Sequence, residues 1–527
     1  MASVQLYDTT LRDGAQSEGI SFSVVDKLHI VQKLDELGIH YIEGGWPGSN
    51  PKDTDFFNKA KNLSLSNSLL VAFGSTRYPG AKAENDANLL ALTDAGVKVV
   101  TIVGKSSELQ VTQVLETTLD ENLSMIADSV RFLKEKGLTV FFDAEHFFDG
   151  FKSNSAYALR TLQSAAEAGA DCLVLCDTNG GALPDEIIKA VEAAGKSTSV
   201  PLGIHTHNDG ELAIANSLAA VRAGATQVQG TVNGYGERCG NANLCSIIPA
   251  LKLKMGIDCI TDAQLVKLTD VSLYISEVAN LVPDSYAPYV GLSAFSHKGG
   301  LHVSGLSKWA ESYQHIEPSL VGNRQRVVVS ELSGKKNIIY KAKGLGFDLP
   351  PGGKEVKDLL EQVKFLESRG FQYDNAEASF ELLLHRAKPD YNPPFELVDF
   401  MVVVETKRRP SARKSAEDMM SEAIVKVRVR KEIMHTAAEG DGPVNALDRA
   451  LRKALLQFYP SLAQVKLVDY KVRILEESIG TESQVRVLIE SSDGVEEWRT
   501  VGSSTNIIEA SWLALADSLE YWLLKQG

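Results

Sequence analysis

Leu-Gly-Ile-His-Thr-His-Asn-Asp, at residues 202–209, is a short apolar run that ends in polar side chains. Similar apolar runs occur throughout the first half of the chain, at residues 4–7, 41–43, 69–73, 99–103, 140–142, 172–176 and 227–232. They recur about every thirty residues, which is the length of one strand followed by one helix. This spacing predicts eight repeated strand–helix units.

Amphipathic patterns typical of helices lie between several of these runs, at residues 26–37, 123–136, 156–168 and 211–223. Glycines that can end a helix follow several units, at Gly38, Gly96, Gly137, Gly169 and Gly224. Eight units of this kind predict a closed (β/α)8 TIM barrel. An open, doubly wound sheet is the alternative, and the even spacing favours closure.

The repeat ends near residue 278, so we predict a catalytic barrel at residues 1–278 and two further regions. Residues 279–395 contain helix patterns around Tyr313 and at 354–368, with Gly/Pro clusters at 349–353 and 392–394. We interpret this region as a helical connector that overhangs the barrel mouth. Residues 396–527 contain the same pattern twice, in which strands are followed by a helix. A strand at 424–433 precedes a helix from 440 to 456, and strands at 485–489 and 498–501 precede a helix at 507–523. They predict an α+β domain with an internal repeat.

The composition is that of an ordinary globular protein, with 44% hydrophobic and 23% charged residues among 527. A net charge of -14 argues against nucleic acid or an anionic membrane as a partner, and favours small molecules and copies of the same chain. Without a signal-like start or a long apolar stretch, the sequence predicts a cytoplasmic protein. We expect the basic run at 407–414 to be a solvated loop, and Cys172 and Cys176 to be reduced core residues.

A metal site is the first chemical prediction. His205 and His207 are two positions apart on a strand, so both imidazoles point to one side. Asp13 follows the first strand, and in a barrel the C-terminal ends of all strands meet at one mouth. These three side chains can bind one divalent cation, with Asn241 as a further oxygen donor. Zn, Mn, Co and Mg all suit such ligands.

The open positions of this cation suit a 2-oxo acid, whose carboxylate and ketone oxygens chelate a metal that then polarises the ketone. Arg12 can stabilise the developing alkoxide, and Thr178 can hold the carboxylate, although Thr178 is also a typical turn residue. Formation of a carbon–carbon bond at the ketone needs a base. Glu145 and His302 are both candidates, and the sequence does not choose between them.

Four motifs, at residues 8–14, 205–209, 233–241 and 296–302, together resemble the 2-isopropylmalate, homocitrate and citramalate synthase family of metal-dependent Claisen-condensing enzymes. Two further motifs, at 440–445 and 504–511, are similar to the domain of that family that senses leucine or isoleucine. The resemblance extends over the whole chain. Residues 43–53 and 142–150 are most similar to the citramalate-forming members.

The resemblance implies that pyruvate and acetyl-CoA condense to (R)-citramalate and CoA on a route to isoleucine. It also implies a homodimer that is inhibited by isoleucine or leucine, and a connector that contributes to the acyl-CoA site. The implied residues are the metal ligands Asp13, His205 and His207 with Asn241 nearby, Arg12 on the ketone, Thr178, Glu43 and Asp143 on the substrate, Glu145 as base, and His302 with Tyr313 at the acetyl-CoA end.

Two departures from the family pattern bear on these roles. Ala15 stands where many members carry Glu or Asn, so the support of Arg12 stays open. The motif at 142–150 differs from that of the isopropylmalate synthases, and it should help to shape the keto-acid pocket. A 2-isopropylmalate or homocitrate synthase that uses a larger acid is therefore an alternative. More distant alternatives are a lyase or a biotin-dependent carboxyltransferase, and a non-catalytic scaffold that senses amino acids.

Overall fold

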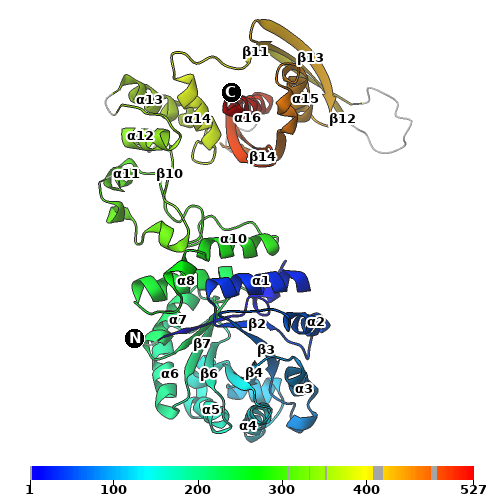
Figure 1. Ribbon diagram of the computed structural model, residues 1–527, viewed down its shortest axis with the longest axis vertical. Coiled ribbons are helices and arrows are strands. Elements are labelled where there is room, and N and C mark those ends of the chain that lie inside the picture. The colour runs from blue at the N-terminus through cyan, green and yellow to red at the C-terminus, as the bar shows by residue number, and fades with distance from the viewer. Residues whose placement is uncertain are drawn as a thin grey trace, which may run out of the picture. The chain divides into compact units, whose positions relative to one another are not determined.

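A computed structural model describes residues 3–306, 308–330, 333–350, 353–406, 419–475 and 483–526 (Figure 1). The chain forms two compact units, one from residues 1–295 and 316–325 and the other from 296–315 and 326–527. The boundaries predicted after residues 278 and 395 stay predictions. The basic run at 407–414, and Pro351 and Gly352 of the predicted linker, lie outside the described residues.

Eight parallel strands of the first unit close into a barrel in the order of the sequence, as predicted. The strands are β1 (Gln5–Asp8), β2 (Tyr41–Gly45), β3 (Leu69–Ser75), β4 (Val99–Lys105), β5 (Thr139–Glu145), β6 (Cys172–Asp177), β7 (Leu202–Thr206) and β8 (Gln227–Gly230). Closure comes from β1 and β8, which pair in parallel over four residues, from Gln5 opposite Gln227 to Asp8 opposite Gly230. The open-sheet alternative is therefore wrong.

Helices surround the strands in Figure 1 and bury one apolar face against them. They are α1 (Val24–Leu37), α2 (Pro51–Ala60), α3 (Ala87–Asp94), α4 (Leu119–Glu135), α5 (Phe147–Glu167), α6 (Pro184–Ser197), α7 (Ala213–Arg222) and α8 (Leu244–Pro249), followed by α9 (Asp262–Leu265) and α10 (Leu268–Val278). Gly38 ends α1 in the left-handed conformation, with φ 90°, as predicted for a C-terminal glycine.

The inside of the barrel holds a second, smaller core of side chains from alternate strand positions. It comprises Tyr7, Val71, Val99, Phe141, Cys172, Val174 and Cys176. Cys172 and Cys176 are thus reduced, buried core residues, as predicted. This layer closes the barrel from below, so polar side chains at the strand ends rest on an apolar floor.

The second unit begins with short elements and then forms helices. Strands β9 (Ser296–His297) and β10 (Arg326–Val327) pair in parallel. The helices are α11 (Gly300–Leu306), α12 (Lys335–Gly344), α13 (Lys354–Ser368) and α14 (Glu377–Arg386). The predicted helix at 354–368 is confirmed as α13. Around Tyr313 only a short 3-10 turn forms, at Ala310–Tyr313.

Two similar halves follow, each with three antiparallel strands and one helix, which confirms the predicted repeat. The first contains β11 (Glu396–Thr406), β12 (Met419–Val429), β13 (Glu432–Gly440) and α15 (Pro443–Leu455). The second contains β14 (Lys466–Ile474), β15 (Val485–Ser492), β16 (Glu497–Ser504) and α16 (Ile507–Gln526).

The prediction of one strand at 424–433 is wrong. A tight turn at Arg430 and Lys431 divides this segment between β12 and β13. Arg430 has φ 55°, a conformation that Asn or Gly adopts more readily at a hairpin turn. Arg430 continues the apolar–polar alternation of β12, so the pattern concealed the turn.

In the described part of the chain, no helix is both long and apolar enough to cross a membrane.

Candidate active site

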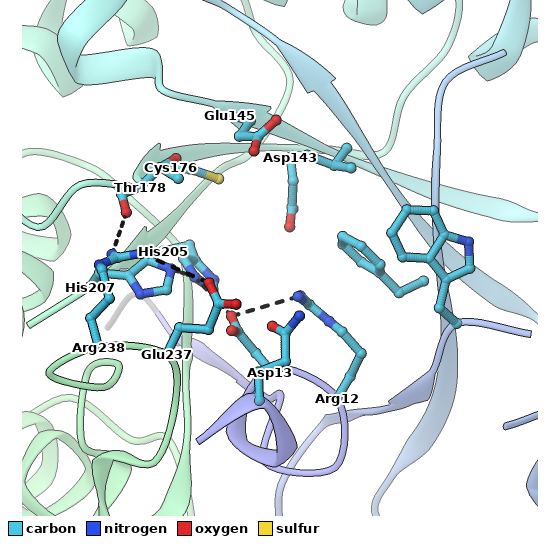
Figure 2. Close-up of a pocket in the computed structure, with 14 residues that line it drawn as sticks. Arg12, Asp13, Asp143, Glu145, Cys176, Thr178, His205, His207, Glu237 and Arg238 are labelled. Carbon is cyan, nitrogen blue, oxygen red and sulfur yellow. Dashed lines mark hydrogen bonds and ion pairs between the residues drawn. The ribbon is translucent and has the colours of Figure 1, made fainter. Parts of the chain in front are cut away.

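A cavity of about 220 Å³ lies at the C-terminal ends of the barrel strands (Figure 2). The side chains that line it are Arg12, Asp13, Gln16, Trp46, Phe73, Val103, Asp143, Glu145, Cys176, Thr178, His205, His207, Glu237 and Arg238. Seven of them were predicted from the sequence as site residues: Arg12, Asp13, Asp143, Glu145, Thr178, His205 and His207. Glu43 and Asn241 lie behind this lining, and His302 and Tyr313 belong to the second unit.

Asp13, His205 and His207 form a compact cluster at the cavity. Their potential ligand atoms all lie within 4.8 Å of one another, and all three side chains are buried. His205 Nε2 is 3.3 Å from Asp13 Oδ2 and 3.4 Å from His207 Nε2. One carboxylate and two imidazoles are ligands suited to a divalent first-row metal.

Two unsatisfied atoms support a cation at this place. Within the described residues, His207 Nδ1 and Asn241 Oδ1 are buried and have no hydrogen-bond partner. His207 and Asn241 face each other in an isolated backbone bridge, and the amide group of Asn241 donates to the Tyr235 carbonyl oxygen at 3.3 Å. A buried amide oxygen without a partner is costly, and a metal ion would satisfy it. The residues therefore fit the predicted metal.

The charge states of Asp13 and His207 also fit a metal. Burial raises the pKa of Asp13, but Arg12 and His205 outweigh burial and hold this pKa well below its usual range. Burial, together with His205, lowers the pKa of His207 to about 4. At neutral pH the carboxylate is thus ionised and His207 is neutral, the forms in which these groups bind metals.

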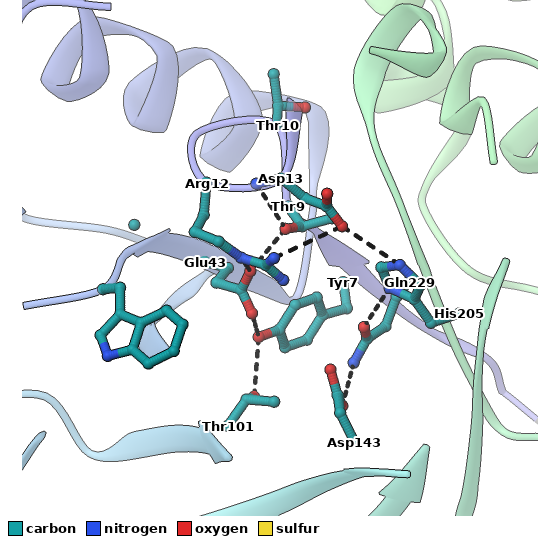
Figure 3. Close-up of polar contacts among 12 residues, drawn as sticks. Tyr7, Thr9, Thr10, Arg12, Asp13, Glu43, Thr101, Asp143, His205 and Gln229 are labelled. Atoms are coloured by element: carbon teal, nitrogen blue, oxygen red, sulfur yellow. Dashed lines mark hydrogen bonds and ion pairs between the residues drawn. The ribbon is translucent and has the colours of Figure 1, made fainter. Parts of the chain in front are cut away.

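Arg12 is held in one orientation by three contacts, of which those with Glu43 and Asp13 are drawn in Figure 3. Its Nε donates to Glu43 Oε1 at 2.6 Å, its guanidinium carbon lies 3.8 Å from the centre of the Phe73 ring, and one terminal nitrogen is 3.7 Å from Asp13 Oδ2. The sequence left open which residue supports Arg12, because Ala15 stands where many family members carry Glu or Asn. In the structure Glu43 provides this support.

Glu43 is completely buried, and hydrogen bonds satisfy its carboxylate. Thr9 Oγ1 donates to Oε1 at 2.6 Å, and the Tyr7 hydroxyl donates to Oε2. The same Tyr7 hydroxyl lies 2.9 Å from Thr101 Oγ1. The sequence assigned no role to Tyr7, Thr9 or Thr101, because each acts on a partner from another strand.

Glu145 and Thr178 reach the cavity from neighbouring strands. Lys105 Nζ lies 2.5 Å from Glu145 Oε2, so an adjacent cation balances the carboxylate charge. The hydroxyl oxygen of Thr178 accepts a hydrogen bond from the backbone N–H of His146 at 2.8 Å, which leaves its proton free for another acceptor. In the second unit, the rings of His302 and Tyr313 stack with centres 4.2 Å apart.

Arg238 and Glu237 also line the cavity, although the sequence assigned no role to them. Arg238 donates to Asp209 at 2.7 and 2.9 Å and to the carbonyl oxygen of Thr178 at 2.8 Å. These bonds join the loops that follow β6, β7 and β8. The motif at 233–241 contains Arg238, and it was the feature of the sequence that could have indicated a role for this residue.

Asp8 organises the loop that carries Arg12 and Asp13. Its carboxylate accepts hydrogen bonds from Thr10 N at 2.9 Å and Thr10 Oγ1 at 2.8 Å. Thr10 Oγ1 in turn accepts from Val232 N at 2.9 Å, which joins the loops after β1 and β8. Burial raises the pKa of Asp8 to about 7, against the opposing effect of the bonds from Thr10.

Fold and site together define a (β/α)8 barrel with one carboxylate and two imidazoles grouped at its C-terminal mouth. Family models match most of the chain: "HMGL-like" at residues 3–275, "Homocitrate synthase post-HMGL domain-like" at 289–370 and "LeuA allosteric (dimerisation) domain" at 374–523. The chain belongs to the HMGL-like family.

Several curated proteins are similar to the chain over its whole length. It is 54% identical over 525 residues to an (R)-citramalate synthase of Geobacter sulfurreducens, covering 100% of this chain and 98% of that protein. It is 52% identical over 525 residues to an (R)-citramalate synthase of Aquifex aeolicus, covering 99% and 98%. A 2-isopropylmalate synthase of Methanocaldococcus jannaschii is 30% identical over 531 residues, with coverage of 99% and 95%.

The raised pKa of Asp8 predicts a pH-dependent difference between Asp8→Asn and the unchanged protein. Between pH 5.5 and 7, the folded protein holds a proton on Asp8 that the unfolded chain has released, so stability falls as pH rises. The Asp8→Asn variant has no ionisable group at this position, so it does not lose stability in this way. Its free energy of unfolding relative to the unchanged protein should therefore rise by up to about 1.4 kcal/mol per pH unit and level off above pH 7. Urea unfolding at several pH values measures it, and a constant difference would contradict the prediction.

Proposed function

We propose that this protein is an acyltransferase that condenses pyruvate with acetyl-CoA and hydrolyses the thioester, releasing (R)-citramalate and CoA. The observation that carries the proposal is the grouping of Arg12 with Asp13, His205 and His207 in one small cavity. Similarity supports the product: relatives named (R)-citramalate synthase are 54% and 52% identical, whereas the 2-isopropylmalate synthase is 30% identical.

The lining of the cavity favours a small 2-oxo acid. Phe73, Val103 and Cys176 provide its apolar surface, and the Trp46 ring packs edge-on against Phe73 with centres 5.3 Å apart. The guanidinium group of Arg12 also stacks on Phe73, so the Phe73 ring cannot move out of the cavity wall without moving that group. The methyl group of pyruvate suits such a wall, whereas a branched or charged side chain would overlap it or lose its hydration.

The roles of the polar residues follow from their donors and acceptors. A divalent metal held by Asp13, His205 and His207, with Asn241 beside them, would act as a Lewis acid on the ketone. Arg12 donates to the ketone oxygen as negative charge develops there, and Glu43 keeps its guanidinium directed into the cavity. The free hydroxyl proton of Thr178 donates to the substrate carboxylate.

We assign proton removal to Glu145. It lines the same cavity as Arg12 and the metal cluster, and its carboxylate is an acceptor for a proton from the methyl carbon of acetyl-CoA. That carbon then attacks the ketone carbon, and the ketone oxygen takes a proton to become the alcohol. Water subsequently cleaves the thioester. His302 and Tyr313 are proposed to serve the acetyl-CoA end of the reaction, as the family resemblance implies.

The contacts of Arg12 predict a specific effect of Glu43→Gln. Without the ion pair, only Asp13 remains as a charged partner, and Arg12 should turn away from the ketone oxygen. We expect kcat/KM for pyruvate to fall roughly 10- to 100-fold. The matched control is Tyr7→Phe, which leaves the pair of Arg12 and Glu43 intact and should change kcat/KM less than about threefold. An unchanged kcat/KM in Glu43→Gln would show that Arg12 does not depend on this pair.

The substrate is tested by measuring CoA release from acetyl-CoA with three keto acids in the presence of a divalent metal. We expect pyruvate to exceed 2-oxoisovalerate and 2-oxoglutarate in kcat/KM by about 100-fold, because the larger side chains overlap the apolar wall. Asp13→Ala should abolish CoA release with all three acids. A clear preference for 2-oxoisovalerate would indicate an isopropylmalate synthase, and a preference for 2-oxoglutarate a homocitrate synthase.

We further propose that the protein is a homodimer and that isoleucine inhibits it through the C-terminal domain. The match of residues 374–523 to an allosteric dimerisation domain supports a dimer and an allosteric effector, and the family resemblance implies isoleucine or leucine as that effector. Helix α15 begins after Gly442, which has no side chain that could cap the first turn. Free N–H groups at a helix start attract carboxylates, which suits the carboxylate of an amino acid. The start of α16 differs, because Asn506 Oδ1 accepts hydrogen bonds from Ile508 N and Glu509 N.

Gly442→Asp tests this position. Gly442 has an extended backbone, and a Cβ at this residue would meet no atom within 4 Å. An aspartate would cap α15, stabilise it by about 1 kcal/mol and occupy the N–H groups that a carboxylate needs. We expect the inhibition constant for isoleucine to rise at least about tenfold. Gly442→Ala, which brings no carboxylate, should keep the normal inhibition. Equal inhibition of both variants by isoleucine would contradict the proposed position.

A further inference from the structure

A chain of buried hydrogen bonds lies behind His205, on the side away from the metal cluster (Figure 3). His205 Nδ1 lies 2.9 Å from Gln229 Oε1, and Gln229 Nε2 donates to Asp143 Oδ1 at 3.2 Å. The three side chains come from β7, β8 and β5, and they are 5%, 1% and 3% exposed. Bulk solvent therefore has little access to these hydrogen bonds.

The donors and acceptors of this chain define its direction. Asp143 Oδ1 accepts a hydrogen bond from the NH2 group of Gln229, so the amide oxygen of Gln229 faces His205. An amide oxygen only accepts hydrogen bonds, so the proton of the His205 ring must be on Nδ1. In the neutral ring the other nitrogen, Nε2, carries the lone pair, and it is the atom that faces Asp13 and His207.

We propose that Gln229 is a positioning residue for the metal site. It fixes His205 in the tautomer and ring orientation in which Nε2 binds a divalent metal, and Asp143 fixes Gln229. This inference rests on the proposed metal site, and it assigns a role to a residue outside every motif found in the sequence. Partners that orient a metal-binding histidine in this way typically change metal affinity by roughly 10- to 100-fold when they are removed.

Gln227 provides a closely matched control on the same strand. It lies two positions before Gln229, so both side chains point to the same side of β8. Gln227 is also 1% exposed, but within the described residues neither atom of its amide group has a hydrogen-bond partner. Gln227→Leu therefore alters size and polarity as Gln229→Leu does, without removing a hydrogen bond to His205.

The test is the affinity of the metal-free, full-length protein for Mn²⁺, measured from the electron paramagnetic resonance signal of the free ion. We expect Gln229→Leu to bind Mn²⁺ roughly 10- to 100-fold more weakly and Gln227→Leu to stay within about threefold of the unchanged protein. In the double variant Asp143→Asn with Gln229→Glu, the new carboxylate accepts from both neighbours. This variant should recover Mn²⁺ affinity to within about threefold. Thermal unfolding of each metal-free protein reports whether it folds.

The outcomes separate this inference from the function on which it rests. Equal Mn²⁺ affinity in Gln229→Leu and Gln227→Leu would overturn the inference. It would also be overturned by a folded double variant that binds Mn²⁺ at least tenfold more weakly, a result that remains decisive if Gln229→Leu does not fold. If Asp13→Ala binds Mn²⁺ as the unchanged protein does, the proposed metal site itself fails, and the inference fails with it.

Discussion

The parallel pairing of β1 with β8 is the constraint on which the site depends. Without it, β1 would be one edge of an open sheet, and the loop that carries Arg12 and Asp13 would lie far from β7. The pairing continues beyond the strands, because Thr9 N donates to the Gly230 carbonyl oxygen at 2.9 Å and Val232 N donates to Thr10. Barrel closure thus places Asp13 beside His205, although the two are 192 positions apart in the sequence.

Paired charges give the cavity its fixed electrostatic character. Arg12, Lys105 and Arg238 each lie 2.5–2.7 Å from a carboxylate oxygen, of Glu43, Glu145 and Asp209 respectively. Removing Arg12 and Glu43 from water is costly, and hydrogen bonds from Tyr7 and Thr9 to Glu43 offset part of that cost. Because the partners hold the charged groups in place, little reorganisation is needed when charge develops on a substrate. Rigidity of the cavity is therefore a consequence of how its charges are paired.

Local patterns explain what the sequence could predict. The strand positions, the glycine at the end of α1 and the shared direction of His205 and His207 all depend on residues close together in the chain. Gln229, Tyr7 and Lys105 escaped prediction because their roles depend on partners 86, 36 and 40 residues away (145 − 105 for Lys105), on other strands. The choice between Glu145 and His302 was also open for a physical reason. One lines the barrel cavity, and the other belongs to a different compact unit.

Within the second unit, polar contacts form a continuous path from the C-terminal helix to the segment that contains His302. Arg386 of α14 donates to Asp517 of α16 at 2.6 Å, and Lys341 of α12 donates to Glu377 of α14 at 2.7 Å. Lys336 of α12 then donates to Ser304 of α11 at 2.9 Å, two residues from His302. Each contact joins a different pair of helices, so a shift of α16 cannot leave α14 unaffected. An amino acid bound near α15 or α16 would act on His302 only by favouring one of two arrangements of these helices. The directional ion pair between Arg386 and Asp517 suits that role better than apolar packing, because it is lost over a small displacement.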